Sequence, residues 1–456
     1  MAVSTRAGHT LTLLEDGSLC VFGDNGSGQL GIGTKIKHEA PIVLSTADVF
    51  VGEKMVMVAT GYWHSACVSE VGAVWTWGKH DKGQLGRGTA RAAGHEDFDQ
   101  TTPGRIDPSS FGHSPAVMVV CGNFFTMILT DAGHVWSCGC NHFGSLGLGH
   151  VDQAHIPTQI NPAHFGGIPI GVIAAGDFHA MAIDREGRAM WAWGINEHGV
   201  LGLGQSINQP QYNHPMCIPA GAFDGVQIAS IATGNRASTV VTVEGTLWVC
   251  GQVPHVNSVD GGVEVRSHAY TRVGGAEVFG EGGVRMVSGG GLHSFIVAKD
   301  GSMWRCGSTH YHQHLTRIDM SHFRNPRIVA AASGGGVAIA VSAQGRVFTW
   351  GLYGGKGVGP YDRHGVSTEH IRIPCRLRIH RFNGKRVGRW YRVPADITLA
   401  FVLGRHAHFA AEGGRTAYSD DDMPEELLIS LFESMRFRPR AIASQAVNLL
   451  LGMDLE

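Results

Sequence analysis

Histidines recur at one position of a repeated pattern, and they are the side chains in this chain with the most chemistry to offer. His64, His179 and His293 each stand three residues after a glycine. An imidazole can act as a general base or as a metal ligand. Recurrence at one repeat position favours a structural role instead, in which a ring nitrogen satisfies a loop carbonyl, because burying unpaired polar groups is costly.

A second histidine group alternates along the chain at His310, His312 and His314, so on a strand all three would share one face. These residues could form a zinc site, but histidine-rich loops without metal are commoner and no carboxylate stands beside them. The sequence also lacks a Ser-His-Asp order, a phosphate loop, a dinucleotide fingerprint and zinc-hydrolase spacing. We therefore predict no catalytic residues, no metal and no cofactor, and we expect a protein that is not an enzyme.

The loops that carry the first histidine group also hold residues suited to partner binding. Trp63, Phe124 and Phe178 each precede the histidine position by one residue, in loops that we expect to be exposed. Exposed aromatic side chains near the centre of a ring of repeats suit a protein-binding hot spot, although they could equally plug the mouth of that ring. The predicted partner-binding residues are Trp63, Asn123, Phe124, Asp177, Phe178, Asn235 and Arg236.

A basic segment spans residues 360–396, where nine Lys and Arg side chains stand against three acidic ones. Trp390 and Tyr391 lie among them, a composition that suits binding to a phosphate backbone or to an acidic partner. The alternative is a solvated rim strand from which Arg376 and Arg378 point outward. The net charge of −2 on the whole chain favours neither interpretation. The predicted basic patch comprises Arg372, Arg376, Arg378, Arg381, Lys385, Arg386 and Arg389.

Both groups of residues depend on a pattern that returns seven times. An anchor glycine is followed eleven residues later by a turn glycine, and a short apolar run then ends on a closing glycine, as at Gly61, Gly72 and Gly78. Self-similarity of this kind indicates a repeat architecture. The turn glycines are Gly17, Gly72, Gly133, Gly187, Gly245, Gly301 and Gly345.

Each copy predicts four short strands. In the second copy they cover residues 56–59, 64–68, 73–77 and 103–106, where β-branched and aromatic residues lie between glycine turns. The fourth begins at a proline, which suits an outer rim because an edge proline loses no ladder hydrogen bond. Separate sheets would expose both faces, whereas a radial arrangement buries each sheet against the next. The sequence therefore predicts an all-β fold, a seven-bladed β-propeller of four-stranded blades.

The two ends of the repeat region predict how the ring closes. The first copy begins almost directly at a second strand, residues 9–14, and the last ends on an unpartnered first-type strand, residues 397–403. We expect these N- and C-terminal strands to pair and complete the blade begun by residues 9–44, because an unpaired edge invites aggregation. Residues 1–411 would form the propeller and 412–423 an acidic linker. Residues 424–456 would form a short pair of helices that docks on the propeller or on another chain.

Composition favours an intracellular protein. Nine cysteines are an odd number, several occupy predicted strand cores, and no C-x-x-C pair occurs. This pattern is typical of reduced core thiols. The sequence shows neither a secretory signal nor an apolar run long enough to span a bilayer. We expect a location in the cytoplasm or nucleus, with no membrane partner.

The repeat resembles that of the regulator of chromosome condensation family. The copies share Gly-x-x-His, then Val-Trp-x-Trp-Gly, then a Gly-x-Leu-Gly-x-Gly string that occurs at residues 28–33, 83–88, 144–149 and 199–204. The resemblance covers roughly residues 1–411 and implies a seven-bladed propeller closed by its termini. Copies five and six depart from the pattern after Gly251 and Gly307, so the loops on that side of the ring are not those of the family.

The resemblance leaves three functions open, because a fold alone does not determine activity. The first is a protein-interaction propeller that binds a macromolecular partner through its ring-face loops. The second is a guanine-nucleotide exchange factor; in such members the small GTPase docks at these loops and acidic residues matter, and here Asp177 fits. The third is chromatin or nucleic-acid binding through the basic patch. Light sensing is not expected, since only residues 61–65 approach the tryptophan-rich repeats of the plant ultraviolet-B receptor.

Overall fold

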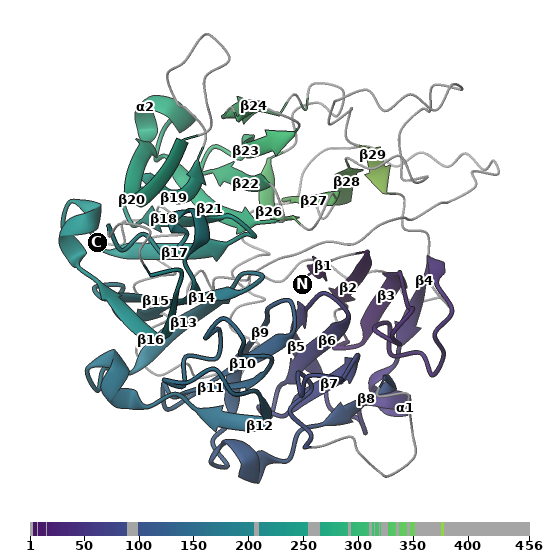
Figure 1. The fold of residues 1–456 in the computed structure, drawn as a ribbon. Helices are drawn as coiled ribbons and strands as arrows, with labels where there is room; N and C mark the ends of the chain where they lie inside the picture. Colours follow the sequence, from purple (N-terminus) through teal and green to yellow (C-terminus); the bar gives the residue numbers. More distant parts are fainter. Residues whose placement is uncertain are drawn as a thin grey trace, which may run out of the picture.

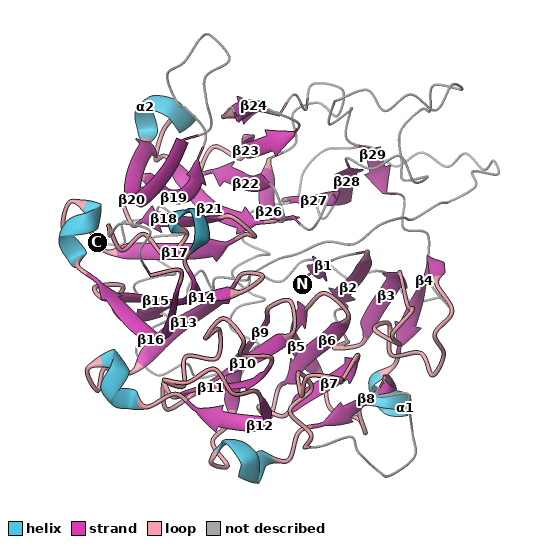
Figure 2. Ribbon diagram, in the orientation of Figure 1, coloured by secondary structure: helices cyan, strands magenta, loops and turns pink. Residues whose placement is uncertain are grey.

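The computed structural model describes most of the first 350 residues of the chain. The described residues are 3–6, 8–14, 16–88, 99–204, 209–253, 265–290, 293–309, 312–313, 315–318, 320, 327–333, 337–343, 347–351 and 375–377. Within them the chain is almost entirely strand and turn (Figure 2), which confirms the all-β prediction.

The strands form seven antiparallel sheets, of which six have four strands and one has five. We number the sheets in chain order. Sheet 1 holds β1 (Val3–Arg6), β2 (His9–Leu13), β3 (Leu19–Gly23) and β4 (His38–Leu44). Sheet 2 holds β5 (Met55–Thr60), β6 (His64–Ser69), β7 (Val74–Gly78) and β8 (Gln100–Arg105). Sheet 3 holds β9 (Ala116–Cys121), β10 (Phe125–Thr130), β11 (Val135–Gly139) and β12 (Ala154–Gln159).

Sheet 4 holds β13 (Ile170–Ala175), β14 (His179–Asp184), β15 (Met190–Ile195) and β16 (Gln211–Ile218). Sheet 5 holds β17 (Ile228–Thr233), β18 (Ala237–Thr242), β19 (Leu247–Val253) and β20 (Val265–Gly274). Sheet 6 holds β21 (Val284–Gly289), β22 (His293–Ala298), β23 (Met303–Thr309), β24 (His312–Gln313) and β25 (Thr316–Arg317). Sheet 7 holds β26 (Ile328–Ser333), β27 (Val337–Ser342), β28 (Val347–Gly351) and β29 (Cys375–Leu377).

The first strands of the sheets lie towards a common centre and the fourth strands towards the rim (Figure 1). Neighbouring sheets touch through these inner strands in chain order, from β1 and β2 against β5 to β21 and β22 against β26. The first strand of sheet 1, β1, also contacts β26 of sheet 7. The sheets therefore pack face against face along the whole described chain.

The inner edge of sheet 1 differs from the prediction. The place beside β2, expected for residues 397–403, is taken by β1, which pairs with β2 from Val3 opposite Thr12 to Arg6 opposite His9. The buried Ser4 hydroxyl lies 3.0 Å from the Thr60 hydroxyl, so β1 also bonds to sheet 2. Residues 3–6 escape prediction from sequence because Arg6 stands where the other copies have the anchor glycine that follows the first strand. Residues 397–403 themselves lie outside the described residues.

The glycines of the repeat have distinct structural tasks. Each closing glycine pairs with the residue three after the anchor, so His64 lies opposite Gly78 and His179 opposite Gly194. Gly194, one residue late in sequence, is thus in register with the others. Gly78 adopts a φ of 100°, and a Cβ there would approach the Trp63 carbonyl oxygen to 2.5 Å. A side chain at the closing position is therefore excluded both by strain and by space.

The described residues include six short helical turns, which the sequence did not predict. They are α1 (Thr46–Val49), α2 (Ala276–Phe279), η1 (Pro108–Phe111), η2 (Pro162–Phe165), η3 (Glu197–Gly199) and η4 (Ala220–Phe223). Five of them precede the first strand of a sheet, and the sixth, η3, lies between the third and fourth strands of sheet 4. All except η3 carry a repeat phenylalanine at or just after their last residue, and these rings are buried. Phe50, Phe165 and Phe223 stand edge-on to Trp75, Trp191 and Trp248, with ring centroids 5.5, 5.5 and 5.9 Å apart. The helical turns thus position the aromatic filler between sheets.

A loop carbonyl links each of the first four sheets to the next. The residue before the leucine in each Gly-x-Leu-Gly-x-Gly string presents its carbonyl to the following sheet. The Gln29 oxygen accepts from Trp77 Nε1 at 2.8 Å, and the Ser145 oxygen accepts from Trp193 Nε1 at 3.0 Å. The Gln84 oxygen accepts the Thr126 hydroxyl at 2.8 Å in the same way. We call these contacts the carbonyl clamp.

The loop that presents each clamp carbonyl is held by one polar side chain. Asn25 accepts the Leu30 N–H at 2.9 Å and donates to the Thr34 carbonyl at 2.8 Å, and Asn141 makes the same bonds in sheet 3. In sheet 2 this place belongs to His80, whose Nδ1 accepts the Leu85 N–H at 3.4 Å. Its Nε2 therefore carries the proton and donates to the Gly88 carbonyl at 2.9 Å.

Several predictions from sequence lie outside the described residues. They concern the acidic linker, the C-terminal helices, and His310 and His314. Sheet 6 does depart from the four-stranded pattern, since β24 and β25 both pair with β23. Like sheet 5, it lacks the Gly-x-Leu-Gly-x-Gly string after its closing glycine.

An anchor glycine should not tolerate a side chain. A Cβ at Gly61 would overlap the His64 ring and lie 2.8 Å from the Gly122 carbonyl oxygen of the next sheet. We expect Gly61→Ala to lower the free energy of unfolding by about 2–4 kcal/mol, because backbone and ring must both shift. Urea unfolding measures this effect. Gly26→Ala is the matched control, since nothing lies within 4 Å of a Cβ there. Equal stability of the two variants would contradict the claim that the anchor position has no room for a side chain.

His80 should make sheet 2 sensitive to acid. Burial, with a smaller contribution from nearby Arg87 and His155, holds the pKa of His80 below its ordinary value of 6.5, although Asp81 and the Gly88 carbonyl oppose this. The folded chain therefore resists a proton that the unfolded chain accepts, so stability is full above pH 6.5 and declines as the pH falls towards the folded pKa.

The matched variant is His80→Asn, which restores the side chain found in sheets 1, 3 and 4. We expect it to unfold at the same or higher urea concentration at pH 7.5, and to lose less stability than the natural chain between pH 7.5 and 5.5. Unfolding titrations at the two pH values test this expectation. Identical losses in both proteins would show that His80 does not contribute.

Candidate protein-binding face

The residues predicted to bind a partner all lie on one side of the sheets. In an antiparallel four-stranded sheet, the loop between strands one and two and the loop between strands three and four emerge at the same end. We call the surface made by these loops the loop face. The clamp carbonyls lie beneath the loop face. The loops that form this face therefore also carry the hydrogen bonds that join one sheet to the next.

Three aromatic side chains from sheets 2 and 3 meet on the loop face. The Trp63 ring lies 5.2 Å from the Phe124 ring at 52°, and the neighbouring Tyr62 ring lies 4.4 Å from Trp63 at 74°. Trp63 and Phe124 are half-buried, and 37% of Tyr62 is exposed. We call these three residues the aromatic cluster. Its rings are partly open to solvent and therefore do not simply fill the protein interior.

A second aromatic contact follows on sheets 3 and 4. Phe178, in the first loop of sheet 4, packs against Phe143 with ring centroids 5.0 Å apart. Phe143 lies in the second loop of sheet 3 and is 36% exposed. Phe143 was missed from sequence. The available signal was its phenyl ring at the position where the other copies carry Ser27, Lys82 and His198.

The polar predicted residues form a chain of contacts between loops. The Asn123 N–H donates to the Asp177 carbonyl at 3.1 Å, and Asn235 Nδ2 donates to Asp177 Oδ2 at 2.6 Å. Asn123 and Asp177 are buried, each 9% exposed, whereas Arg236 is exposed. Asp177 thus acts within the protein as a link between sheets 4 and 5.

Two of the recurrent histidines, His64 and His179, bond to the next sheet. His64 Nε2 lies 2.9 Å from the Thr126 hydroxyl and His179 Nε2 lies 2.9 Å from the Ser238 hydroxyl. Each hydroxyl already donates its single proton to a clamp carbonyl, Gln84 for Thr126 and Val200 for Ser238. The imidazole must therefore be the donor. The predicted structural role fits these contacts, with the difference that a hydroxyl stands between the ring and the loop carbonyl.

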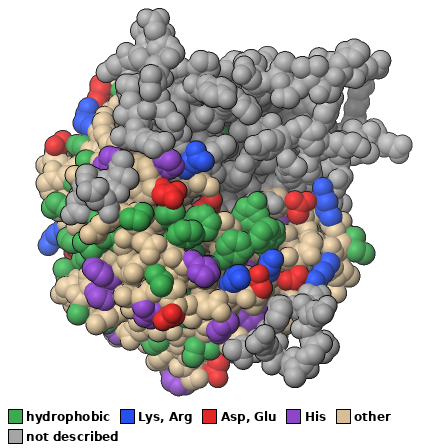
Figure 3. Space-filling view, viewed as in Figure 1, with side chains coloured by type: hydrophobic (Ala, Val, Ile, Leu, Met, Phe, Trp, Pro, Cys, Tyr) green, Lys and Arg blue, Asp and Glu red, His purple; other side chains and the backbone are tan. Residues whose placement is uncertain are grey.

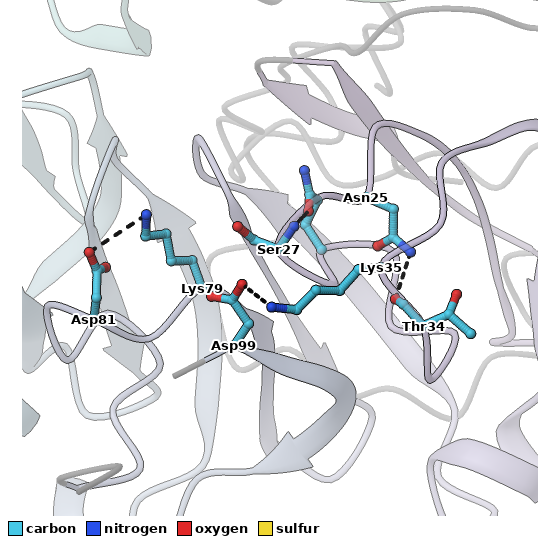
Figure 4. Close-up of polar contacts among 8 residues, drawn as sticks. Asn25, Ser27, Thr34, Lys35, Lys79, Asp81 and Asp99 are labelled. Carbon is cyan, nitrogen blue, oxygen red and sulfur yellow. Dashed lines mark hydrogen bonds and ion pairs between the residues drawn. The ribbon is translucent and has the colours of Figure 1, made fainter. Parts of the chain in front are cut away.

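Ion pairs border the aromatic cluster on the side of sheets 1 and 2. Lys79 Nζ lies 3.6 Å from Asp81 Oδ2, and Lys35 Nζ, from a sheet 1 loop, lies 2.7 Å from Asp99 Oδ2 (Figure 4). In one view of the molecule, hydrophobic side chains gather towards the middle, with acidic and basic side chains alternating beside them (Figure 3). An apolar centre with a charged border is the usual anatomy of a protein-binding surface.

The described residues offer little for covalent or metal chemistry. No group of three His, Cys, Asp or Glu side chains within them could hold a metal ion. Burial raises the pKa of Cys20, Cys250 and Cys306 to about 12 each, which keeps these thiols protonated at neutral pH. In the same part of the chain, no helix has the length and apolar character needed to cross a bilayer.

The predicted basic patch is almost wholly beyond the described residues. Arg376 lies in β29 opposite Phe348 of β28, so a fourth strand does form there. The other members are Arg372, Arg378, Arg381, Lys385, Arg386 and Arg389, and the patch stays a prediction.

Comparison with known proteins gives the family. Residues 1–274 match the RCC1-like domain. The chain is 28% identical over 397 residues to the ultraviolet-B receptor UVR8 of Arabidopsis thaliana, covering 81% of this chain and 84% of the receptor. It is 31% identical over 244 residues to the mitochondrial RCC1 domain-containing protein RUG3 of the same plant, covering 53% and 52%. It is 28% identical over 255 residues to human E3 ubiquitin-protein ligase HERC2, covering 55% of this chain but 5% of that ligase.

Solved structures agree on the fold. Human WBSCR16 superposes with a TM-score of 0.63 at 21% identity, covering 75% of this chain and 87% of that one. Prp20p of Saccharomyces cerevisiae superposes with a TM-score of 0.62 at 20% identity, covering 83% and 88%. The glycine-anchored sheets, the clamp loops and a family match over more than half of its length lead to one conclusion: the chain belongs to the RCC1-like domain family.

Proposed function

We propose that this protein is an interaction module that binds a protein partner through the loop face. The observation that carries the proposal is the partial exposure of the aromatic cluster beside a second aromatic pair, Phe143 and Phe178. Tryptophan, tyrosine and phenylalanine are enriched in interfaces because they offer large contact areas at a low cost in side-chain entropy. The charged border supplies the polar rim that such interfaces have.

The rigidity of the loop face supports this function. The Trp63 backbone carbonyl accepts the Lys79 N–H at 2.9 Å, and the Tyr62 N–H donates to the Asn123 carbonyl at 3.3 Å. Each aromatic loop is thus bonded both within its own sheet and to the next. A partner would meet side chains already held near their bound positions, which lowers the entropy lost on binding.

We further propose that the seven sheets are the blades of one closed ring. The support is the contact between β1 and β26, which brings the first and last described sheets together. In this arrangement β1, rather than residues 397–403, supplies the inner edge of the first blade. Pairing of residues 397–403 with the N-terminal blade stays a prediction, and it would require a place other than the one that β1 holds.

Exchange-factor activity towards a small GTPase is the second candidate. Asp177 is the acidic loop residue that the family resemblance singles out, and Prp20p is a relative in fold with described binding to Gsp1p and histones. Asp177 is 9% exposed and already bonded to Asn235, so a direct role would require the loop to rearrange. If this protein accelerates the release of labelled GDP from a small GTPase, and Asp177→Ala loses that effect, the exchange-factor candidate is supported.

Chromatin or nucleic-acid binding, the third candidate, rests on the basic patch alone.

Truncating the aromatic cluster should weaken partner capture. We expect the double variant Trp63→Ala, Phe124→Ala to weaken binding of proteins retained by the natural chain by about 30-fold or more, since interface hot spots contribute about 2 kcal/mol or more. The measurement is affinity capture with quantitative mass spectrometry. Val71→Ala is the control, because Val71 is 59% exposed but lies in a turn at the opposite end of sheet 2. Equal capture by all three proteins would refute binding through the loop face.

A further inference from the structure

The aromatic cluster already holds a cation from its own chain. Lys79 Nζ lies 4.6 Å from the centroid of the Trp63 ring. The face of an aromatic ring carries negative charge density and attracts an ammonium group placed over it. Tyr62 and Phe124 meet Trp63 at steep angles of 74° and 52°, so the three rings do not lie in one plane.

The repeat geometry forces Lys79 and Trp63 together. In copies two to four the residue after the closing glycine donates its N–H to the carbonyl of the second loop residue, as in Lys79 to Trp63 at 2.9 Å and Cys140 to Phe124 at 2.9 Å. Ile195 to Phe178 repeats the bond at 3.0 Å. Among these three copies the cation occurs only in the one that carries tryptophan. The backbone thus presents one side chain to the other, and this copy combines an ammonium with the best aromatic acceptor.

We propose that Tyr62, Trp63 and Phe124 form a binding site for a cationic side chain, lysine or arginine, of the protein partner, and that Lys79 occupies this site in the free protein. The inference deepens the proposed function and rests on it. Charge complementarity selects the ligand: ring faces that already attract one ammonium will attract another of the same chemistry.

Two neighbouring features agree with a site that can exchange its occupant. Asp81 Oδ2 already lies 3.6 Å from Lys79 Nζ while that ammonium lies over the ring, so the carboxylate can keep its ion pair with Lys79 when another cation takes the ring face. Phe143 and Phe178, by contrast, are accompanied by Ile195 at the equivalent position. That second pair therefore provides an apolar contact without a cation, and the two aromatic groups would bind different parts of the partner.

Fluorine NMR of the full chain labelled with 5-fluorotryptophan tests the site directly. Trp63→Phe identifies the Trp63 signal by its loss. Tetramethylammonium chloride is the probe, sodium chloride holds the ionic strength constant, and tert-butanol is the uncharged probe of similar shape. We expect tetramethylammonium to shift the Trp63 signal saturably, with a half-saturation about two- to fivefold lower in Lys79→Ala than in the natural chain. Lys79→Arg should behave like the natural chain.

Two results would overturn the inference. An equal response to tert-butanol would show an apolar site rather than a cation site. Equal half-saturation in Lys79→Ala and the natural chain would show that Lys79 does not occupy it. If the ammonium titration fails while the aromatic double variant still loses its partner, the cation site falls and the proposed function stands. If the titration succeeds but the aromatic double variant captures the partner as well as the natural chain does, the proposed function is contradicted instead.

Discussion

Hydrogen bonds from one sheet to a loop carbonyl of the sheet before it are the interaction on which the structure depends. Four such carbonyls, those of Gln29, Gln84, Ser145 and Val200, accept a tryptophan, hydroxyl or thiol donor from the next sheet. Each carbonyl is buried where sheets meet, so leaving it without a donor would cost more than the bond contributes. The clamp thus fixes the position of each sheet relative to its neighbour as well as adding stability.

The same contacts explain why an interaction surface forms here. The loop that presents the Gln84 carbonyl begins next to Lys79. The Thr126 hydroxyl donates to this carbonyl and accepts a hydrogen bond from His64, three residues after the anchor glycine. Trp63 lies between that glycine and that histidine. The backbone at Trp63 is therefore held by the buried hydrogen bonds of His64, Thr126 and Gln84, while the Trp63 ring remains partly exposed on the loop face. Binding surfaces on loops gain affinity when a rigid framework positions them in this way.

Much of the framework could be predicted from sequence because glycine and aromatic spacing is set by local rules. The turn, anchor and closing glycines predicted strands β2 to β16, and the tryptophans before Gly78 and Gly194 are buried as expected. Strand β1 and the turns before the first strands escaped prediction because four residues are too few to show a period. The Asp107-Pro108 and Asn161-Pro162 pairs, which cap η1 and η2, were the available signals.

The binding residues were harder to predict, since exposure depends on how neighbouring sheets meet. Trp63, Phe124 and Phe178 were found by their place in the repeat, but Lys79 and Phe143 come from other loops and meet them only in three dimensions. Asp177 looked like an exposed acidic contact and is instead buried against Asn235. Sequence position identified the loops, whereas the contacts between loops decided which side chains are available.

Amide hydrogen exchange in Thr126→Val tests the central claim most directly. The substitution keeps the shape of the side chain but removes the hydroxyl that bonds to both His64 and Gln84. If the clamp holds the loop face, residues 61–64 and 80–88 should lose protection by about tenfold, while Thr158→Val, an exposed threonine on β12, changes nothing there. Unchanged protection of both loops in Thr126→Val would contradict the account.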